Sequence, residues 1–231
     1  GAPDVAADAE VIAVMCEVMC ALGVESFTML VNDRKLIDAL LLGLGIDDVE
    51  KQKHVLRVID KRAKVGLENV RLELGPGRID ESGDPIPGAQ LPENVIDKLL
   101  AFIALEARTR KEMLTVMKGS LPESETAAEA IAEMTDLADC LDALGLEEKH
   151  VRFDPSLARG LDYYTGPVFE MILPQAPQFG SVMGGGRYDG LVARFMDRPI
   201  PATGASVGID RLLAALEALD GLPKIPESVQ V

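Results

Sequence analysis

The segment that most constrains the fold is residues 159–173, where a polar motif leads directly into an alternating strand. The motif reads Arg-Gly-Leu-Asp-Tyr-Tyr-Thr-Gly and ends at Gly166. In the strand that follows, one set of side chains alternates with another: Val168, Glu170 and Ile172 with Phe169, Met171 and Leu173. Successive side chains of a strand point to opposite faces of a sheet. A strand with a purely structural role needs neither the arginine nor the paired tyrosines, so the pattern predicts a sheet that carries a binding site.

Two glycine-rich segments, 184–191 and 204–212, follow this motif. The first comes directly after a predicted strand over 179–183 and reads Gly-Gly-Gly-Arg-Tyr-Asp-Gly-Leu. Consecutive glycines let a ligand approach the backbone closely. The segment lacks the lysine and the Ser/Thr of a P-loop, and a flexible turn is an equally good interpretation.

The second glycine-rich segment is predicted to be a small-residue strand that runs into a helix over 209–219. Arg211 then lies in the first turn of that helix. Free N–H groups and the helix dipole favour anions at this position, so an arginine alone is electrostatically unfavourable there. This conflict indicates a phosphate ligand near Arg211.

The remaining pattern divides the chain into a core and an insertion. A helix is predicted over 4–22 and a short strand over 27–31, which ends in a turn at 32–33. Residues 50–148 are mostly helical, and strand-like sequence resumes at Val151. We therefore expect a first part of the core at 1–49, a helical insertion domain at 50–148, a second part of the core at 149–222 and a tail at 223–231.

Composition narrows the function classes. The net charge of −15 argues against a nucleic-acid footprint over the whole surface, although it leaves room for a local basic patch. No apolar run reaches the roughly 18 residues that a membrane-spanning helix needs. The N-terminus has no signal-peptide pattern. We therefore predict a cytoplasmic protein without a membrane span.

The cysteines Cys16, Cys20 and Cys140 have no CxxC spacing, which fits a reducing compartment. Cys16 and Cys20 are four residues apart and share one face of a helix. Two small buried apolar residues are favoured there over a pair of metal ligands. Because the chain has only two histidines, we predict no metal site.

Arg159, Tyr163 and Tyr164 are the strongest candidates for a binding site. A guanidinium presents donors in a fixed fork that suits a carboxylate or a phosphate. Adjacent tyrosines on a strand point opposite ways, so one can face a pocket while the other packs. The alternative is that Arg159 pairs with Asp154 or Asp162 and that both tyrosines only pack.

A basic cluster is a second candidate site. Between residues 51 and 64 there are six basic residues and one acidic residue. The basic residues predicted to share one helical face are Lys53, Arg57, Lys61 and Lys64. Such a face can meet a nucleic-acid backbone, although a solvated helix face is the alternative. Residues 121–148 carry nine acidic residues and no basic ones, and we expect that helix to avoid phosphates.

The three motifs, in their order and spacing, resemble those of the histidyl-tRNA synthetase family. Residues 159–170 are similar to its first histidine-specific motif and residues 185–191 to its second. Residues 204–212 are similar to motif 3 of class II aminoacyl-tRNA synthetases, and residues 1–10 to the segment that follows motif 2. The resemblance covers essentially the whole chain, weakly over 50–148. It implies an α+β fold with a class II antiparallel sheet flanked by helices, and a helical insertion.

The resemblance also implies roles for single residues. Arg159 would be the catalytic cation near the α-phosphate of ATP and the carboxylate of histidine. Tyr163, Tyr164 and Tyr188 would line the histidine pocket, and Arg211 would bind the phosphates of ATP, which Mg²⁺ would accompany. Histidine tRNA would be the further substrate, and the insertion domain would clasp its acceptor arm. The four basic residues named above then become candidate tRNA contacts, and the full-length protein is expected to be a homodimer.

The sequence contains nothing similar to motif 1, motif 2 or an anticodon-binding domain. The resemblance therefore implies an internal fragment of the catalytic domain, and we expect this fragment to be unable to form histidyl-adenylate alone. Two alternatives stay open. One is a synthetase-like regulatory subunit of ATP phosphoribosyltransferase, and the other is a non-catalytic synthetase-like domain that binds tRNA.

Overall fold

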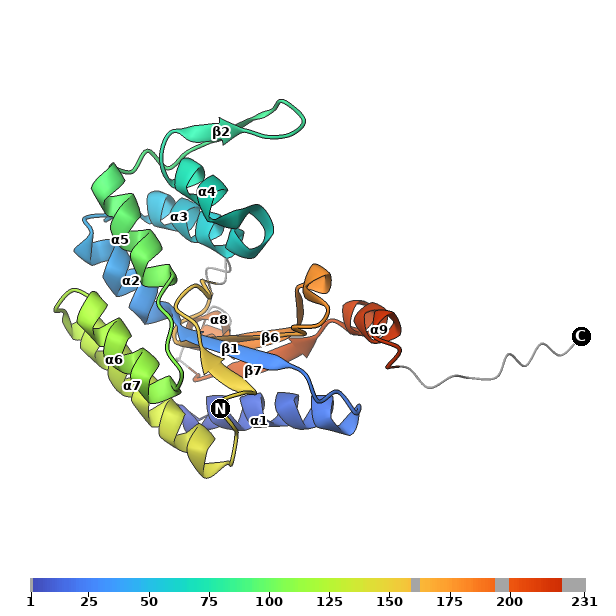
Figure 1. Cartoon of the computed structure of the whole chain (residues 1–231). Helices are drawn as coiled ribbons and strands as arrows, with labels where there is room; N and C mark the ends of the chain where they lie inside the picture. The colour runs from blue at the N-terminus through green and yellow to red at the C-terminus, as the bar shows by residue number, and fades with distance from the viewer. Residues whose placement is uncertain (1, 159–162, 194–199, 222–231) are drawn as a thin grey trace, which may run out of the picture.

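A five-stranded sheet forms the centre of the molecule (Figure 1). The structure, a computed structural model, describes residues 2–158, 163–193 and 200–221. The strands lie in the order β4-β1-β5-β6-β7, with the bounds Thr28–Asp33 for β1, Val151–Phe153 for β4, Pro167–Ile172 for β5, Ser181–Arg187 for β6 and Thr203–Val207 for β7. β4 runs parallel to β1, and the other neighbouring pairs are antiparallel. The predicted α+β class is confirmed, with β4 as the departure from a purely antiparallel sheet.

Helices make up most of the chain between β1 and β4 and also cover the sheet. Their bounds are Ala6–Ala21 for α1, Arg34–Gly43 for α2, Val49–Asp60 for α3, Arg62–Leu74 for α4, Glu93–Ile103 for α5, Arg110–Ser120 for α6, Glu125–Ala143 for α7, Asp189–Ala193 for α8 and Ile209–Ala218 for α9. A short hairpin of β2 (Gly77–Ile79) and β3 (Pro85–Pro87) follows α4. The predicted turn at residues 32–33 is wrong, because both residues belong to β1. Asp33 instead caps α2, since its carboxylate accepts a hydrogen bond from the Lys35 N–H.

α1 packs against β6 and β7. Its buried residues are Asp8, Ala9, Ile12, Met15, Cys16 and Met19. Cys16 is buried as expected, but Cys20 is exposed, so the prediction that both cysteines are buried is wrong. Side chains three and four residues apart share a helix face, so Asp8 lies on the same inward face of α1 as the buried apolar residues.

The helices within 50–148 differ in what they contact. In the view of Figure 1, α3, α4 and the hairpin lie above the sheet, and α1 lies below it. By contrast, α7 packs against α1, α2 and β1, and α6 packs against α7 and β4. The predicted insertion domain therefore includes two helices that pack on the core, and its boundaries at residues 50 and 148 stay a prediction.

The two faces of the sheet carry different side chains. Val31, Phe169 and Met171 point to the α1 face and belong to the main hydrophobic core. A smaller cluster of Leu157, Tyr164 and Val168 is separate from that core, and Leu30, Tyr163 and Tyr188 pack against it. Val168 precedes Phe169 in β5, so it points to the opposite face of the sheet. The tyrosines thus gather on the face away from α1.

Among the described residues, no helix combines the length and the apolar character needed to cross a bilayer.

Candidate functional site

The three tyrosines predicted to line a pocket form one cluster. The rings of Tyr163 and Tyr164 have centroids 4.5 Å apart and are tilted by 47°. The ring of Tyr188 meets that of Tyr163 edge-on, with a centroid distance of 6.1 Å. The Tyr163 hydroxyl donates to the Tyr164 hydroxyl oxygen at 3.4 Å. Edge-on and tilted ring contacts of this kind are favourable beyond simple burial, and here they join side chains from two of the predicted motifs.

The expectation that Tyr163 and Tyr164 point opposite ways is wrong. Both residues precede β5, which begins at Pro167, so the alternation of a strand does not apply to them. Tyr164 is the more buried, at 8 % exposure, and packs with Leu157 and Val168. Tyr163 is half-buried and lies between Tyr164 and Tyr188.

Glycines in β6 and β7 make room for this cluster. A Cβ at Gly186 would lie 2.8 Å from the ring of Tyr164, and a Cβ at Gly204 would lie 2.7 Å from the hydroxyl of Tyr188. Gly184–Gly186 lie within β6, so the interpretation as a flexible turn is wrong. At Gly186 and Gly204 the missing side chains leave space that tyrosines of the same chain occupy.

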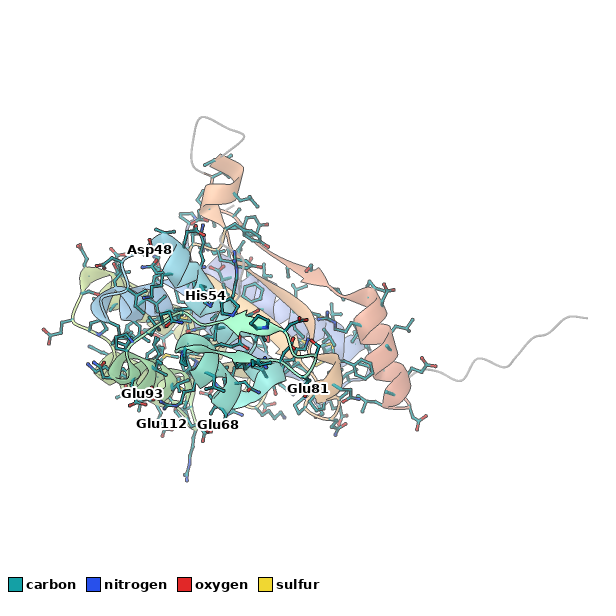
Figure 2. The ribbon with its side chains drawn as sticks, turned by 90° about the horizontal axis from the view of Figure 1, so that it is seen from above. Asp48, His54, Glu68, Glu81, Glu93 and Glu112 are labelled. Carbon is teal, nitrogen blue, oxygen red and sulfur yellow. The ribbon has the colours of Figure 1, made fainter. Side chains whose placement is uncertain are left out.

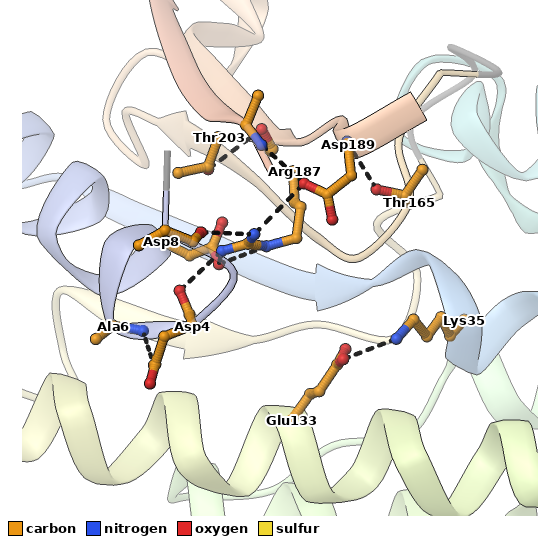
Figure 3. A network of polar contacts seen from close by, with 12 residues as sticks. Asp4, Ala6, Asp8, Lys35, Glu133, Thr165, Arg187, Asp189 and Thr203 are labelled. Atoms are coloured by element: carbon orange, nitrogen blue, oxygen red, sulfur yellow. Dashed lines mark hydrogen bonds and ion pairs between the residues drawn. The ribbon is translucent and has the colours of Figure 1, made fainter. Parts of the chain in front are cut away.

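A buried arginine network lies on the α1 face of the sheet, opposite the tyrosine cluster. Figure 3 shows its contacts. Arg187, at the end of β6, is 5 % exposed, and Asp8 of α1 is 0 % exposed. Nε and Nη2 of Arg187 donate to Asp8 Oδ2 at 3.0 and 2.6 Å. The same guanidinium donates to the carbonyl oxygens of Ala2 and Asp4 and to Asp189 Oδ1. The network ties the start of the chain to the end of β6.

Burial governs the charges of this ion pair. It raises the pKa of the Asp8 carboxyl above its ordinary value, while hydrogen bonds from Thr203 and Arg187 oppose that shift. Burial alone would lower the pKa of Arg187, but its hydrogen bonds to Asp8 and the Asp8 charge raise it. The guanidinium therefore stays charged and holds the carboxylate in its buried position.

Sequence reasoning missed Asp8 and Arg187. The signal was present in α1, where a stripe through residues 8, 12, 15, 16 and 19 is apolar apart from Asp8. A single carboxylate on a buried stripe requires a cation or a donor from elsewhere. Arg187 follows glycines in a buried strand and is a candidate for that cation.

Arg211 lies near the opposite end of β6 from the tyrosines. It falls in the first turn of α9, as predicted, and its side chain is exposed. Its Nη1 donates to the Ser181 carbonyl oxygen at 2.6 Å. An open cavity of about 440 Å³ adjoins it, lined by Ser181, Val182, Met183, Gly184, Ser206, Gly208, Ile209, Asp210 and Arg211. A cation beside a cavity and a helix N-terminus can hold an anionic group.

The predicted basic face is divided between two helices. Lys53 and Arg57 belong to α3, which ends at Asp60, whereas Lys64 belongs to α4. Lys61 lies at the junction, so the expectation of one continuous helical face is wrong. Figure 2 shows this region from above, with His54 on α3 and Glu68 on α4. Lys53 forms an ion pair with Glu50 at 2.9 Å, while Arg57, Lys61 and Lys64 are exposed.

Arg159, the predicted catalytic cation, lies outside the described residues. Within the described ranges, no group of three or more His, Cys, Asp and Glu side chains is arranged to hold a metal ion. The structure therefore brings together Tyr163, Tyr164 and Tyr188, and it leaves Arg211 and the basic residues as separate features.

Comparisons with known proteins agree on one family. The sequence model described as histidyl-tRNA synthetase matches residues 1–212. A histidine–tRNA ligase from Methylocella silvestris is 42 % identical over 100 % of this chain and 48 % of its own length. Another from Brucella ovis is 44 % identical over 96 % of this chain and 47 % of its own length. The chain thus spans about half the length of these curated relatives.

Solved structures give the same result for the fold. The crystal structure of histidyl-tRNA synthetase from Nostoc sp. PCC 7120 has a TM-score of 0.84 and 28 % identity, and the match covers 97 % of this chain and 50 % of that one. A structure from Bacillus halodurans C, titled as an ATP phosphoribosyltransferase regulatory subunit/histidyl-tRNA synthetase, has a TM-score of 0.74 and 27 % identity over 94 % of this chain and 51 % of that one. The motifs, the fold and the extent of these matches lead to one conclusion: the chain belongs to the histidyl-tRNA synthetase family.

Proposed function

We propose that this chain is part of the catalytic domain of a histidine–tRNA ligase, an enzyme that activates histidine with ATP and transfers it to tRNA. The observation that carries the proposal is the convergence of Tyr163, Tyr164 and Tyr188, from two histidine-specific motifs, on one face of the sheet. Phenol hydroxyls beside aromatic rings suit a small planar ligand with ring nitrogens, such as imidazole.

The chemistry has two steps. An oxygen of the histidine carboxylate attacks the α-phosphorus of ATP, the bond to the β-phosphate oxygen breaks, and pyrophosphate leaves. A hydroxyl at the tRNA 3′ end then attacks the acyl carbon, and AMP leaves. The protein contributes mainly by positioning the reactants and by stabilising charge on the phosphoryl group.

The residues of this chain take distinct parts in that scheme. Arg159 would stabilise charge at the α-phosphate and the histidine carboxylate. The tyrosine cluster would orient the imidazole, and Arg211, beside its cavity, would hold phosphates of ATP. Mg²⁺ would enter with ATP as part of the substrate, and we assign no Mg²⁺ ligand in this chain.

The tRNA contact is a further part of the proposal. Residues 50–148 would form an insertion domain against the acceptor arm, with Lys53, Arg57, Lys61 and Lys64 as the contacts. Three of these residues are exposed, which supports a role at the surface. The whole protein would act in the cytoplasm as a homodimer.

A ligand titration tests the histidine site. The chain has three tyrosines and no tryptophan, so its tyrosine fluorescence reports on the cluster alone. A non-hydrolysable histidyl-adenylate analogue should change that fluorescence saturably, and the phenylalanyl analogue should not, because it cannot satisfy the same hydrogen bonds. The matched variant Tyr188→Phe, which removes only a hydroxyl, should weaken the response. Equal responses to the two analogues would contradict the proposal.

A kinetic assay tests whether this stretch of sequence is sufficient for activation. We expect no histidine-dependent pyrophosphate exchange from the chain alone, because the residues expected from motif 2 are not in it. Exchange at the rate of a whole synthetase would contradict that expectation.

The regulatory-subunit alternative has one observation in its favour, the likeness to the Bacillus halodurans C structure. The curated relatives at 42 and 44 % identity carry the ligase name, which supports the ligase. Separate calorimetric titrations with tRNA and with the histidyl-adenylate analogue distinguish the candidates. Binding of both supports the ligase, binding of tRNA alone supports a non-catalytic tRNA-binding domain, and binding of the analogue without tRNA supports the regulator.

A further inference from the structure

We propose that Asp8 and Arg187 are positioning residues that hold the tyrosine cluster in its binding geometry from the opposite face of the sheet. The consequence for substrate rests on the proposed function, whereas the effect on the tyrosines does not. Arg187 points toward α1 and its neighbour in sequence, Tyr188, contacts Tyr163 on the other face. The end of β6 thus joins a buried ion pair to the predicted binding surface.

Arg187 is fully occupied by the protein itself. A guanidinium has five N–H donors, and the hydrogen bonds of Arg187 use all of them. Two go to Asp8, one to Asp189, one to the Ala2 carbonyl and one to the Asp4 carbonyl. With no donor left for a ligand, Arg187 cannot contact substrate in this arrangement, so any effect on binding has to pass through neighbouring residues.

One backbone hydrogen bond connects Arg187 to the segment after Tyr164, and another fixes the neighbouring residue, Tyr188. The Thr165 N–H, next to Tyr164, donates to the Arg187 carbonyl oxygen at 2.9 Å. The Tyr188 N–H donates to the Ala202 carbonyl oxygen at 2.8 Å. If the Arg187 side chain were released, these bonds would lose the anchor that fixes the end of β6, and Tyr164 and Tyr188 would both gain freedom.

Asp189 closes the other side of the clamp. Its N–H donates to Thr165 Oγ1 at 3.1 Å, and its carboxylate accepts a bond from the Ala202 N–H at 2.8 Å (Figure 3). The same carboxylate oxygen accepts from Arg187. Residues 187 and 189 lie on either side of Tyr188 in the sequence. Together they hold two neighbouring segments, the one that follows Tyr164 and the one that leads into β7.

Near-ultraviolet circular dichroism provides the test, because all three tyrosines of the chain belong to the cluster and there is no tryptophan. The variants are Asp8→Asn and Arg187→Lys, each measured without ligand. We expect loss of most of the tyrosine band while the far-ultraviolet helix signal is kept. Asp189→Ala, in which the altered side chain is partly exposed, gives a second and milder test if the buried variants fail to fold.

Arg110→Lys is the matched control. Arg110 is as buried as Arg187, at 2 % exposure, and its guanidinium donates to Asp142, Leu146 and Val151. None of these partners belongs to the tyrosine cluster. If both substitutions lower thermal stability but only Arg187→Lys loses the tyrosine band, the positioning role is supported. Equal retention of the band in both variants, with Asp189→Ala also unchanged, would overturn it.

A second readout connects the clamp to substrate. In Asp189→Ala, the affinity for the histidyl-adenylate analogue should fall by roughly 10- to 100-fold, because a small displacement of binding groups is costly. Arg110→Lys should leave that affinity unchanged. An unchanged affinity in Asp189→Ala despite loss of the tyrosine band would overturn the substrate part of this inference. Failure of the unsubstituted chain to prefer the histidyl analogue would instead count against the proposed function.

Discussion

The two ends of β6 carry two candidate binding features, and they are built in opposite ways. At the Arg187 end, the tyrosines rest on glycines, and a buried ion pair anchors the strand from the other face. At the Ser181 end, Arg211 is exposed and donates a hydrogen bond to a main-chain oxygen beside an open cavity. The chain completes the first end with its own side chains and leaves the second open.

The difference indicates how each end can recognise a ligand. A closely packed cluster that carries hydroxyl groups discriminates by shape and by the penalty for unpaired polar groups. An exposed arginine beside a cavity acts mainly through charge, which salt screens. Under the proposed function, histidine selectivity would depend on residues that also stabilise the fold, and phosphate binding would depend on residues that do not.

The largest expected effect comes from Arg187→Met. The substitution leaves the Asp8 carboxylate buried without its cation, and breaking a buried pair in this way typically costs about 3–5 kcal/mol. Urea unfolding measures the loss. The penalty should shrink as the pH falls, because Asp8 can then be buried in its neutral form. A loss no greater than that of Arg211→Met would break the comparison between the two ends.

Gly185→Ala tests how closely the strands pack at the tyrosine end. A Cβ there would lie 2.1 Å from the Gly204 carbonyl oxygen of β7 and 2.7 Å from the ring of Phe169. Overpacking of this kind costs about 1–3 kcal/mol, and thermal unfolding should show it. Gly190→Ala is the control, because the nearest atom to its Cβ would be 3.9 Å away. Similar stability of the two variants would contradict the close approach of β6 and β7.

The substitution Asp33→Asn tests how the stability of the same end of the sheet depends on pH. Burial raises the pKa of Asp33 well above 3.8, and the charge of Glu133 and its hydrogen bond with Asp33 raise it further. The hydrogen bond from the Lys35 N–H acts in the opposite direction. Lys35 also pairs with Glu133 at 2.7 Å, and the charge of Glu129 acts on Lys35. The folded protein therefore holds a proton on this carboxyl at pH values where the unfolded chain has released it.

The proton bound to Asp33 in the folded protein determines whether stability rises or falls with pH. Stability falls as the pH rises above 3.8 and through the raised pKa of Asp33. Asparagine keeps an oxygen for the Lys35 N–H and removes the ionisation. We expect Asp33→Asn to be more stable than the unsubstituted chain by on the order of 1 kcal/mol at about pH 8, with a smaller difference at about pH 5. A difference that does not change with pH would show that Asp33 is ionised in the folded protein.

The smallest effect on stability should come from Arg211→Ala. The side chain is exposed and far less connected than Arg187, so the free energy of unfolding should change by less than about 0.5 kcal/mol. Its effect on a bound triphosphate should be larger, a roughly tenfold loss of affinity that diminishes in high salt. Isothermal calorimetry with MgATP at two ionic strengths measures both. A large loss of stability would remove the contrast between the ends of β6.

Much of the fold was predictable because its local patterns are strong. The alternation over residues 168–173 predicted β5, and the predicted return strand over 179–183 overlaps the start of β6 at residues 181–183. Helical spacing likewise predicted α1 and the helical character of residues 50–148. Each of these signals lies within a short stretch of sequence, where the period of apolar residues decides between helix and strand.

The parts that could not be predicted depend on contacts between distant residues. Nothing near Asp8 in the sequence indicates that its partner is Arg187, which lies 179 residues away. The glycines of β6 were predicted to form a turn because glycine is common in turns. Their presence in a strand is explained only by the tyrosines that pack against them. Asp33 was predicted to lie in a turn because aspartate is also common in turns, although its carboxylate caps α2.

The long span between Asp8 and Arg187 also bears on how the chain acquires its structure. Loop-closure entropy grows with loop length, by about 0.6 kcal/mol for each doubling, and contacts between distant residues slow folding. During synthesis, α1, β1 and the helical segment are complete well before residue 187 leaves the ribosome. The ion pair between Asp8 and Arg187 can form only after residue 187 has been synthesised. The tyrosine face is likewise completed only after the synthesis of β6. The proposed binding surface is therefore expected to be among the last parts of this chain to become ordered.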